Sequence, residues 1–343
     1  MFLYVNYPSW LHPEIIHGFK YLRWYGLMYL VAFFIAYLFF KLQVKRGELL
    51  TLCKQKKDMS LEDISNVFTY GIIGLLLGAR IFGTLVYNSS YYLTRPYLIF
   101  WPFATHDGRL EFTGFQGMSY HGGFIGGFFG VLLWCKLNKF DFLAIADVMA
   151  LSIPFGYTFG RLGNFANGEL YGRITTSRLG MIFPQVPLLE RFDANLDWVK
   201  DFATQIGITI QEGARTVNLP RHPSQLYEAL FEGVVLGLIL FFLRKKKPFN
   251  GFVTCLYAFG YGFFRFIIEY FRQPDADLGY IINGTGSTNI YIYESWKNLS
   301  MGHVLCLTMM ILSLASLVFL FYKNGTSKNI PNGLFKSIFR GLP

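Results

Sequence analysis

Three charged residues near the end of one apolar stretch have the spacing of a single helical face. Arg265 and Glu269 are four positions apart and Glu269 and Arg272 are three apart, so their side chains are neighbours in a helix. One carboxylate cannot neutralise two guanidiniums, and Arg161 supplies a third cation that we place at a similar depth. This excess of positive charge predicts an anionic ligand, most simply a phosphate that arginine holds bidentately. The alternative is a structural ion pair that holds helices together.

A second group of polar residues lies in the segment Gly160–Arg173, which reads GRLGNFANGELYGR. Asn164, Asn167 and Glu169 alternate there with glycines. We do not expect this segment to continue as a lipid-facing helix, because backbone groups freed from a helix need partners inside a membrane. It predicts a re-entrant turn that folds back into protein or into a cavity. A helix-terminating turn rich in glycine and asparagine is the simpler interpretation, and it accounts for only part of the pattern.

His121 lies at the mouth of another apolar stretch, and glycines follow it at positions 122, 123, 126, 127 and 130. These small-xxx-small patterns allow another helix to approach closely, so we assign the glycines to packing. A histidine at such a place can titrate near neutral pH and act as a general base, which makes His121 a candidate catalytic residue. Taken alone, such a histidine is more often a hydrogen-bonded structural residue. Tyr25, near the start of the first apolar stretch, is a further polar candidate.

Neither a metal site nor a nucleic-acid site is indicated by the sequence. The cysteines, at positions 53, 135, 255 and 306, have no CxxC or other metal-ligand spacing, so we expect buried reduced thiols and no metal or other cofactor. The net charge is +10, but Lys and Arg fall in short clusters between apolar runs and form no extended basic face. We attribute this charge to membrane topology and expect no nucleic-acid partner.

The elements that must position these residues are apolar helices. Of the 343 residues, 53% are hydrophobic and 15% are charged, against roughly 25% charged residues in an ordinary soluble protein. Crossing a bilayer takes about 20 mostly apolar residues in a helix. The qualifying stretches are Arg23–Phe40, Val67–Tyr87, Tyr120–Trp134, Phe142–Phe159, Pro223–Leu243, Phe252–Tyr270 and Val304–Tyr322. We predict an all-α polytopic membrane protein with about seven transmembrane helices, in a single membrane-embedded domain of residues 1–343.

The basic residues of the connecting loops predict the orientation. They follow the first, third, fifth and seventh stretches, and the positive-inside rule assigns those loops to the cytoplasm. The N-terminus is then outside, and the tail of residues 324–343 is cytoplasmic. The outer-face segments are residues 88–119, 160–222 and 271–302. Strong polar groups such as Tyr25, His121, Arg161 and Arg265 then lie toward the outer face, which predicts a polar cavity open to that side.

Several blocks of the sequence resemble the motifs of one family of membrane enzymes. The segment GRLGNFANGELYGR looks like the signature of the bacterial phosphatidylglycerol:prolipoprotein diacylglyceryl transferases. Arg23–Tyr29 resembles that family's first-helix motif, and Ser119–Gly123 resembles its His-Gly-Gly motif. Arg221–Glu228 is similar to the start of its fifth helix, and Arg265–Asp275 to its sixth-helix motif. The blocks follow in order along nearly the whole chain, so their combination is far more specific than any one block.

Two features depart from the family pattern. The last span begins Ser300-Met301-Gly302-His303, where the family usually has glutamine in place of His303. The segment of residues 277–298 is longer than the resemblance leads us to expect. The first departure affects the role expected of position 303. The second affects the expected shape of the outer mouth and the access of a protein substrate.

The resemblance implies transfer of the diacylglyceryl group of phosphatidylglycerol to the thiol of the lipobox cysteine in a prolipoprotein signal peptide, with release of glycerol phosphate. It implies an enzyme of the bacterial cytoplasmic (inner) membrane, with its active site toward the outer face. The nucleophile then comes from the substrate, so the enzyme needs no catalytic cysteine. A free thiol with a pKa of about 8.5 is only partly thiolate at neutral pH, so a base or nearby cations should help to generate the thiolate.

The resemblance also implies roles for the candidate residues. Arginines would hold the lipid phosphate and stabilise the charge that builds on the leaving group, while Glu269 orients them. His121 would assist thiolate formation or orient the headgroup, and Tyr25 would hydrogen-bond the lipid. The candidate catalytic residues are His121, Arg265 and Tyr25. The candidate substrate-binding residues are Arg161, Asn164, Asn167, Glu169, Glu269 and Arg272.

Two other classes of function remain as alternatives. An anion or lipid transporter could also use arginines in an outward-facing cavity, but alternating access usually leaves internal repeats and midplane broken helices, and the sequence shows neither. An intramembrane protease or lipid phosphatase would be expected to carry HExxH, GxSxG or paired aspartates, and these motifs are missing.

Overall fold

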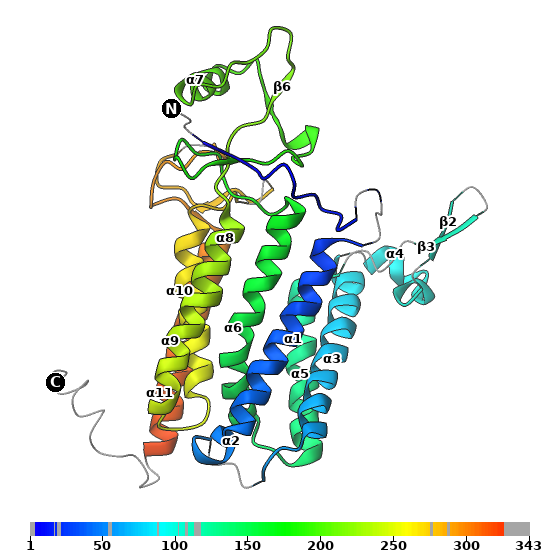
Figure 1. Ribbon diagram of the computed structural model, residues 1–343, viewed down its shortest axis with the longest axis vertical. Helices are drawn as coiled ribbons and strands as arrows, with labels where there is room; N and C mark the ends of the chain where they lie inside the picture. The colour runs from blue at the N-terminus through cyan, green and yellow to red at the C-terminus, as the bar shows by residue number, and fades with distance from the viewer. Residues whose placement is uncertain are drawn as a thin grey trace, which may run out of the picture. The chain divides into compact units, whose positions relative to one another are not determined.

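The computed structural model describes residues 4–16, 18, 22–53, 57–87, 89–101, 103–106, 109–112, 118–274, 277–286 and 289–325. The chain forms two compact units, one of residues 1–39 with 149–343 and the other of residues 40–148. The boundaries fall inside two helices, α1 (Trp24–Lys45) and α6 (Phe142–Asn167), so each of these helices contributes to both units (Figure 1).

The unit of residues 40–148 is built around α3 (Leu61–Tyr87) and α5 (Tyr120–Asn138), which lie side by side (Figure 1). Their contact confirms the packing role predicted for the glycines after His121. A Cβ atom added to Gly126 would lie 2.9 Å from backbone atoms of both Gly74 and Gly78, so the two helices meet backbone to backbone. The shorter elements of this unit are α2 (Glu48–Thr51), α4 (Ser89–Leu93), η1 (Pro96–Ile99) and the antiparallel pair β2 (Phe103–His106) and β3 (Arg109–Phe112).

The other unit contains most of the long helices. α6 is followed by the continuous span of α8 (Ser224–Glu228), η3 (Ala229–Val235), α9 (Leu236–Leu243) and η4 (Arg244–Lys246), and then by α10 (Phe252–Glu269) and α11 (Met301–Gly325). The segment η3 has π-helical hydrogen bonding, which is rare and is often found at functional sites. It inserts an irregular turn into the middle of an otherwise regular span.

Residues 172–222 form a small head between α6 and α8 (Figure 1). It contains α7 (Asp197–Gln205), η2 (Leu188–Glu190), a parallel pair of β4 (Met181–Ile182) with β1 (Val5–Asn6), and an antiparallel pair of β5 (Phe192–Asp193) with β6 (Thr216–Val217). Its core packs Phe192, Val199, Phe202 and Leu219 together. β7 (Tyr280–Ile282) and β8 (Leu299–Ser300) form a further antiparallel pair just before α11.

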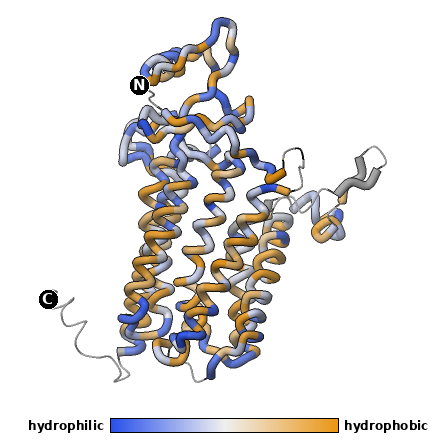
Figure 2. The backbone as a smooth tube through the Cα atoms, in the orientation of Figure 1, coloured by the Kyte–Doolittle hydropathy of each residue, from blue (hydrophilic) through white to orange (hydrophobic). Residues whose placement is uncertain are grey.

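The expected polytopic all-α architecture is confirmed. Among the described residues, six helices are long and apolar enough to cross a membrane, and these are α1, α3, α6, the span of residues 224–246, α10 and α11. Figure 2 shows hydrophobic residues along these helices and hydrophilic residues concentrated at their ends. The third of the seven expected spans corresponds to α5, a helix of 19 residues that is not among these six, because glycines and polar ends lower its hydropathy.

One expected boundary is wrong. The helix α6 does not end at Phe159 but continues to Asn167, so the first half of the segment Gly160–Arg173 is helical. Gly163 and Asn164 are buried in protein, which satisfies the requirement that this polar stretch avoid lipid without a turn at its start. The turn is confined to Gly168 and the residues that follow it. Most of the predicted cytoplasmic tail, residues 326–343, lies outside the described residues.

Candidate active site

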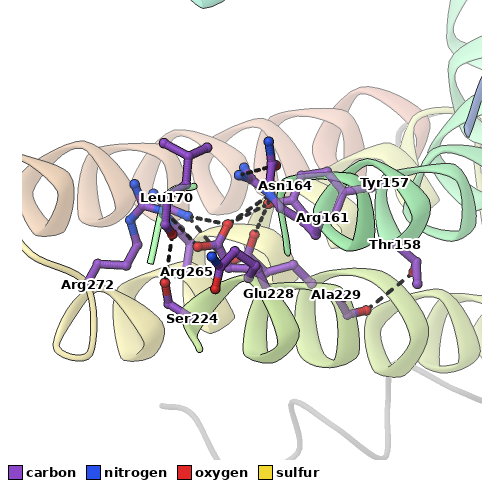
Figure 3. A network of polar contacts seen from close by, with 12 residues as sticks. Tyr157, Thr158, Arg161, Asn164, Leu170, Ser224, Glu228, Ala229, Arg265 and Arg272 are labelled. Atoms are coloured by element: carbon purple, nitrogen blue, oxygen red, sulfur yellow. Dashed lines mark hydrogen bonds and ion pairs between the residues drawn. The ribbon is translucent and has the colours of Figure 1, made fainter. Parts of the chain in front are cut away.

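Three arginines from two helices converge on one buried carboxylate. Glu228, at the end of α8, has a fully buried side chain, and each of its oxygen atoms is paired (Figure 3). Arg161 Nε of α6 lies 2.8 Å from Oε2, and Arg265 Nη1 of α10 lies 3.0 Å from the same oxygen. Arg272 Nη1, just after α10, donates to Oε1 at 2.7 Å. Glu228 therefore fixes the three guanidiniums around a single point.

The π-helical segment that follows brings a second carboxylate to the same place. Glu232, four residues after Glu228, accepts a hydrogen bond from the Tyr157 hydroxyl at 2.5 Å and lies 3.9 Å from Arg265 Nη1. The Tyr157 hydroxyl also accepts a hydrogen bond from Arg161 Nε at 2.7 Å. Tyr157 and Arg161 are one helical turn apart on α6, so this face of α6 is aimed at the two carboxylates.

The helical face predicted from spacing is confirmed. Glu269 Oε2 lies 3.5 Å from Arg265 Nε and 3.6 Å from Arg272 Nε. These distances are longer than those to Glu228, so Glu269 supports the two arginines of α10 from behind while Glu228 makes the short contacts. Glu228 therefore makes shorter contacts with the arginines than Glu269, to which the resemblance gave the orienting role.

The expectation of uncompensated positive charge is wrong. Arg161, Arg265 and Arg272 carry three positive charges when ionised, and Glu228, Glu232 and Glu269 supply three carboxylates against them. Glu228 and Glu232 lie on a different span from Glu269, so residue spacing within α10 could pair the arginines only with Glu269. Charge balance therefore does not require an anion, and any case for phosphate must rest on the geometry of the donors.

In the part of the chain that the structure describes, the ion pairs leave one nitrogen atom of each arginine, Nη2, unused. The ion pairs recorded among the described residues use Nε and Nη1 of these arginines, and Nη2 of each takes no part in them. The side chains of Arg161, Arg265 and Arg272 keep 17%, 17% and 21% of their surface exposed, whereas Glu228 has none. The carboxylate of Glu228 is thus fully buried, whereas the guanidiniums keep part of their surface accessible.

Asn164, Asn167 and Glu169 form one chain of hydrogen bonds that extends this cluster. Arg161 Nη1 lies 3.5 Å from Asn164 Oδ1, and Asn164 Nδ2 donates to Glu169 Oε1 at 3.0 Å. Asn167 Nδ2 donates to Glu169 Oε2 at 2.9 Å. Three of the predicted residues therefore belong together, and they hold a carboxylate beside the arginine cluster.

The turn that makes this possible requires unusual backbone angles. Gly168 has φ +68° and Leu170 has φ 57°, both in the left-handed region that favours glycine. Side chains of α8 hold the turn, because Gln225 Nε2 donates to the Glu169 carbonyl at 2.6 Å and Ser224 Oγ to the Leu170 carbonyl at 3.1 Å. The start of α8 therefore positions both the turn and Glu228.

Backbone hydrogen bonds join the ends of three helices at the same level. Arg173 N donates to the Phe271 carbonyl at 2.9 Å, and His222 N donates to the Arg173 carbonyl at 2.9 Å. The buried Arg173 side chain also donates from Nε to the Arg272 carbonyl at 2.7 Å.

Burial and, secondly, the charge of Arg173 lower the pKa of His222 to about 4, so this histidine is neutral at physiological pH.

The two remaining candidates lie in different parts of the chain. Tyr25 is in the first turn of α1, where its hydroxyl donates to Tyr29 at 3.2 Å, and α1 packs there against Gly163 of α6. His121 is in the first turn of α5 with an exposed side chain, and it belongs to the unit of residues 40–148. The arginine cluster belongs entirely to the other unit.

Tyr157 and Glu232 were not among the residues predicted from the sequence, and Glu228 had no predicted role. Two carboxylates four residues apart in an apolar span were a usable signal, because an ionisable group in such a span is costly unless it is paired. Tyr157 had no comparable signal. The four cysteines are free and buried, as predicted.

Comparison with known proteins finds one family over most of the chain. The prolipoprotein diacylglyceryl transferase family matches residues 13–319. A phosphatidylglycerol–prolipoprotein diacylglyceryl transferase of Treponema denticola is 66% identical over 323 residues, which cover 94% of this chain and 96% of the relative. The proteins of the same name from Treponema pallidum and Borreliella burgdorferi are 54% and 42% identical, over 92% and 90% of this chain and 95% and 91% of their own lengths. The chain belongs to the prolipoprotein diacylglyceryl transferase family.

Proposed function

We propose that this protein transfers the diacylglyceryl group of phosphatidylglycerol to the lipobox cysteine of prolipoprotein signal peptides. The reaction forms a thioether between the cysteine sulfur and the terminal glyceryl carbon of the lipid. The bond between that carbon and the phosphate oxygen breaks, and glycerol phosphate leaves. The thiol proton passes to a base, so the reaction needs no cofactor and no redox partner.

The observation that carries this proposal is the convergence of Arg161, Arg265 and Arg272 on Glu228, with contacts of 2.7 to 3.0 Å. A leaving phosphate gains negative charge as its carbon–oxygen bond breaks. Guanidiniums already fixed in place stabilise this charge without reorganising, and such donors contribute on the order of 3 kcal/mol each. Their partial exposure supports binding of the phosphate between them, while the buried carboxylates keep them in position.

The neighbouring residues suit the rest of the lipid headgroup. Asn164, Asn167 and Glu169 form a polar chain next to Arg161, and they could accept and donate hydrogen bonds to the glycerol hydroxyls. Tyr25 would hydrogen-bond the lipid from α1, which packs on α6 at Gly163. These assignments give headgroup recognition to α6, its terminal turn and the start of α1.

The base that accepts the thiol proton is assigned to His121. A thiol with a pKa of about 8.5 gains from a base at neutral pH and needs less help as the pH approaches that value. If His121 is the base, His121→Gln should lower the transfer rate by about 100-fold at neutral pH, with a deficit that shrinks as pH rises. A headgroup-binding role predicts weaker lipid affinity and a deficit that does not change with pH.

Transfer of a labelled diacylglyceryl group is the direct test of the whole proposal. The purified protein in vesicles of phosphatidylglycerol labelled in the glyceryl moiety should transfer the label to a synthetic lipobox peptide. A cysteine-to-serine peptide is the control, since its hydroxyl is a much weaker nucleophile. Movement of lipid or anion across the vesicle membrane without labelled peptide would support a transporter instead.

We also propose one membrane-embedded transferase domain in the bacterial inner membrane, with the N-terminus and the active site outside and the C-terminus in the cytoplasm. Leu189 is 99% exposed in the head, and Lys246 is exposed at the opposite end of its span. A membrane-impermeant thiol reagent should therefore label Leu189→Cys but not Lys246→Cys in intact spheroplasts. The buried native cysteines keep the background low. Equal labelling at both positions would contradict this orientation.

A further inference from the structure

The start of α11 has the form of a capping box with an unusual third residue. Ser300 precedes the helix, and its backbone N–H donates to Nδ1 of His303 at 3.1 Å. In a capping box, the side chain of the third helical residue reaches back to the backbone N–H of the residue that caps the helix, and that side chain is usually Glu or Gln. His303 makes this contact here through a ring nitrogen.

The hydroxyl of Ser300 makes a contact outside the helix. In a capping box this hydroxyl would accept a hydrogen bond from the first turn. Here Oγ donates to Oε1 of Glu269 at 3.0 Å and also lies 3.0 Å from Nδ1 of His303. Ser300 and Glu269 are 3% and 7% exposed, so the bond is shielded from water. The bond therefore links the start of α11 to the end of α10.

Two further features confine Glu269 at this point. Gly302 has no side chain, and any Cβ atom there would overlap the Glu269 carboxylate, so the carboxylate lies directly against the α11 backbone. Its Oε1 faces Ser300, while its Oε2 faces Arg265 and Arg272 at 3.5 and 3.6 Å. The two carboxylate oxygens of Glu269 thus contact different partners, Oε1 the start of α11 and Oε2 the arginine cluster.

His303 is itself held in place by aromatic rings. Its side chain is fully buried, with ring centroids 5.0 Å from Phe266 and 4.2 Å from Tyr270. Phe266 and Tyr270 flank Glu269 in sequence, so the same part of α10 that carries the carboxylate also packs against the imidazole. The capping box cannot shift without moving the surroundings of Glu269.

We propose that Ser300 and His303 are positioning residues for the reaction, which act through Glu269 to set the arginines that bind the phosphate. His303 fixes the backbone of Ser300, Ser300 fixes one oxygen of Glu269, and the other oxygen supports Arg265 and Arg272. This inference rests on the proposed function. A glutamine at position 303 would accept the same bond through its amide oxygen.

The test separates positioning from helix capping by comparing two substitutions of one residue. Ser300→Ala and Ser300→Gly both remove the hydroxyl, but alanine is a poor N-cap residue whereas glycine is tolerated there nearly as well as serine. If Ser300 positions Glu269, both variants should lower kcat of labelled transfer by about tenfold, as loss of one charge-assisted bond predicts. A role confined to helix capping predicts instead that only the alanine variant is clearly impaired. Ser313→Ala is the matched control, since this buried α11 serine bonds only to the Met310 carbonyl in the described chain.

A double-mutant cycle shows whether Ser300 acts through Glu269. In a Glu269→Gln background, Ser300→Gly should cause little further loss, because the carboxylate that it positions is already gone. His303→Gln should keep near-normal kcat, and His303→Leu should behave like Ser300→Gly. Full additivity in the cycle, or normal kcat of Ser300→Gly beside an active wild type, would overturn the inference. A wild-type protein that transfers no label would instead overturn the proposed function.

Discussion

Replacing Glu228 by glutamine keeps the size of the side chain and removes the charge on which three arginines converge. The carboxylate has ion pairs of 2.7, 2.8 and 3.0 Å, divided between its two oxygens. Glutamine retains one oxygen and presents an amide N–H₂ in place of the other. Whichever way the amide turns, at least one guanidinium then faces a donor instead of an acceptor, and three cations are left with less compensation.

The expected cost follows from the burial of the site. Removing one partner of a buried ion pair costs about 3–5 kcal/mol, because it leaves charge without compensation. Glu232 and Glu269 still lie near Arg265 and offset part of this cost. If about 3 kcal/mol of lost positioning appears in the activation barrier, the transfer rate falls by roughly 150-fold. The lipid KM should rise less, because the arginines remain present but are no longer aligned.

The assay measures kcat and KM of labelled diacylglyceryl transfer, with protein amounts matched and thermal unfolding followed in the same detergent. Glu232→Gln is the paired control, since Glu232 is 3.9 Å from Arg265 and its oxygen can still accept from Tyr157. It should lose less than about tenfold, the equivalent of one modest hydrogen bond. A Glu228→Gln protein that folds and stays within about threefold of the wild-type kcat would refute the claim that this carboxylate aligns the arginines.

Three further predictions test other parts of the site. Arg161→Lys should reduce transfer strongly at unchanged protein level, because an ammonium cannot reproduce the planar grip of a guanidinium on phosphate, and near-normal turnover would reduce Arg161 to a counter-charge. Gly163→Ala should destabilise the protein by about 1–3 kcal/mol, because the new Cβ would lie 2.8 Å from Met28 Cβ. Gly160→Ala is the control: its Cβ would meet no atom within 4 Å, so the thermal midpoint should stay unchanged or rise. Burial lowers the pKa of His222 to about 4 in the folded protein, so the unfolded chain binds the proton more tightly. The contribution of His222 to folding stability should be complete above about pH 6.5 and should be lost as the pH falls toward 4. His222→Gln should flatten this pH dependence of stability, and an unchanged pH profile would contradict the prediction.

Local patterns account for what the sequence predicted correctly. Arg265, Glu269 and Arg272 share a face because three and four residues are close to one helical turn, whatever the rest of the fold does. The glycines at positions 122, 126 and 130 predict a close helix contact for a similar reason, since a helix lined with small residues has one face that another backbone can reach. The apolar spans follow from the thickness of a bilayer.

Two predictions were wrong because they depended on a neighbouring helix. The predicted end of α6 at Phe159 followed from the expectation that a stretch rich in glycine and asparagine cannot face lipid. In the fold Asn164 is buried and bonded to Glu169, so the helix continues to Asn167. Glu269 was likewise predicted as the one carboxylate at the arginines, because the packing that adds Glu228 and Glu232 is not visible in a single span.

By itself, the sequence determined that the chain forms apolar spanning helices and that Arg265 and Glu269 share a helical face. Each of these properties depends on residues within one turn of each other or on the composition of one span. Only the tertiary structure decided that Arg161 meets Glu228 and that Ser300 bonds to Glu269. Those contacts join different helices, and a single sequence specifies them only through the packing of the whole unit, which places distant side chains within hydrogen-bonding distance.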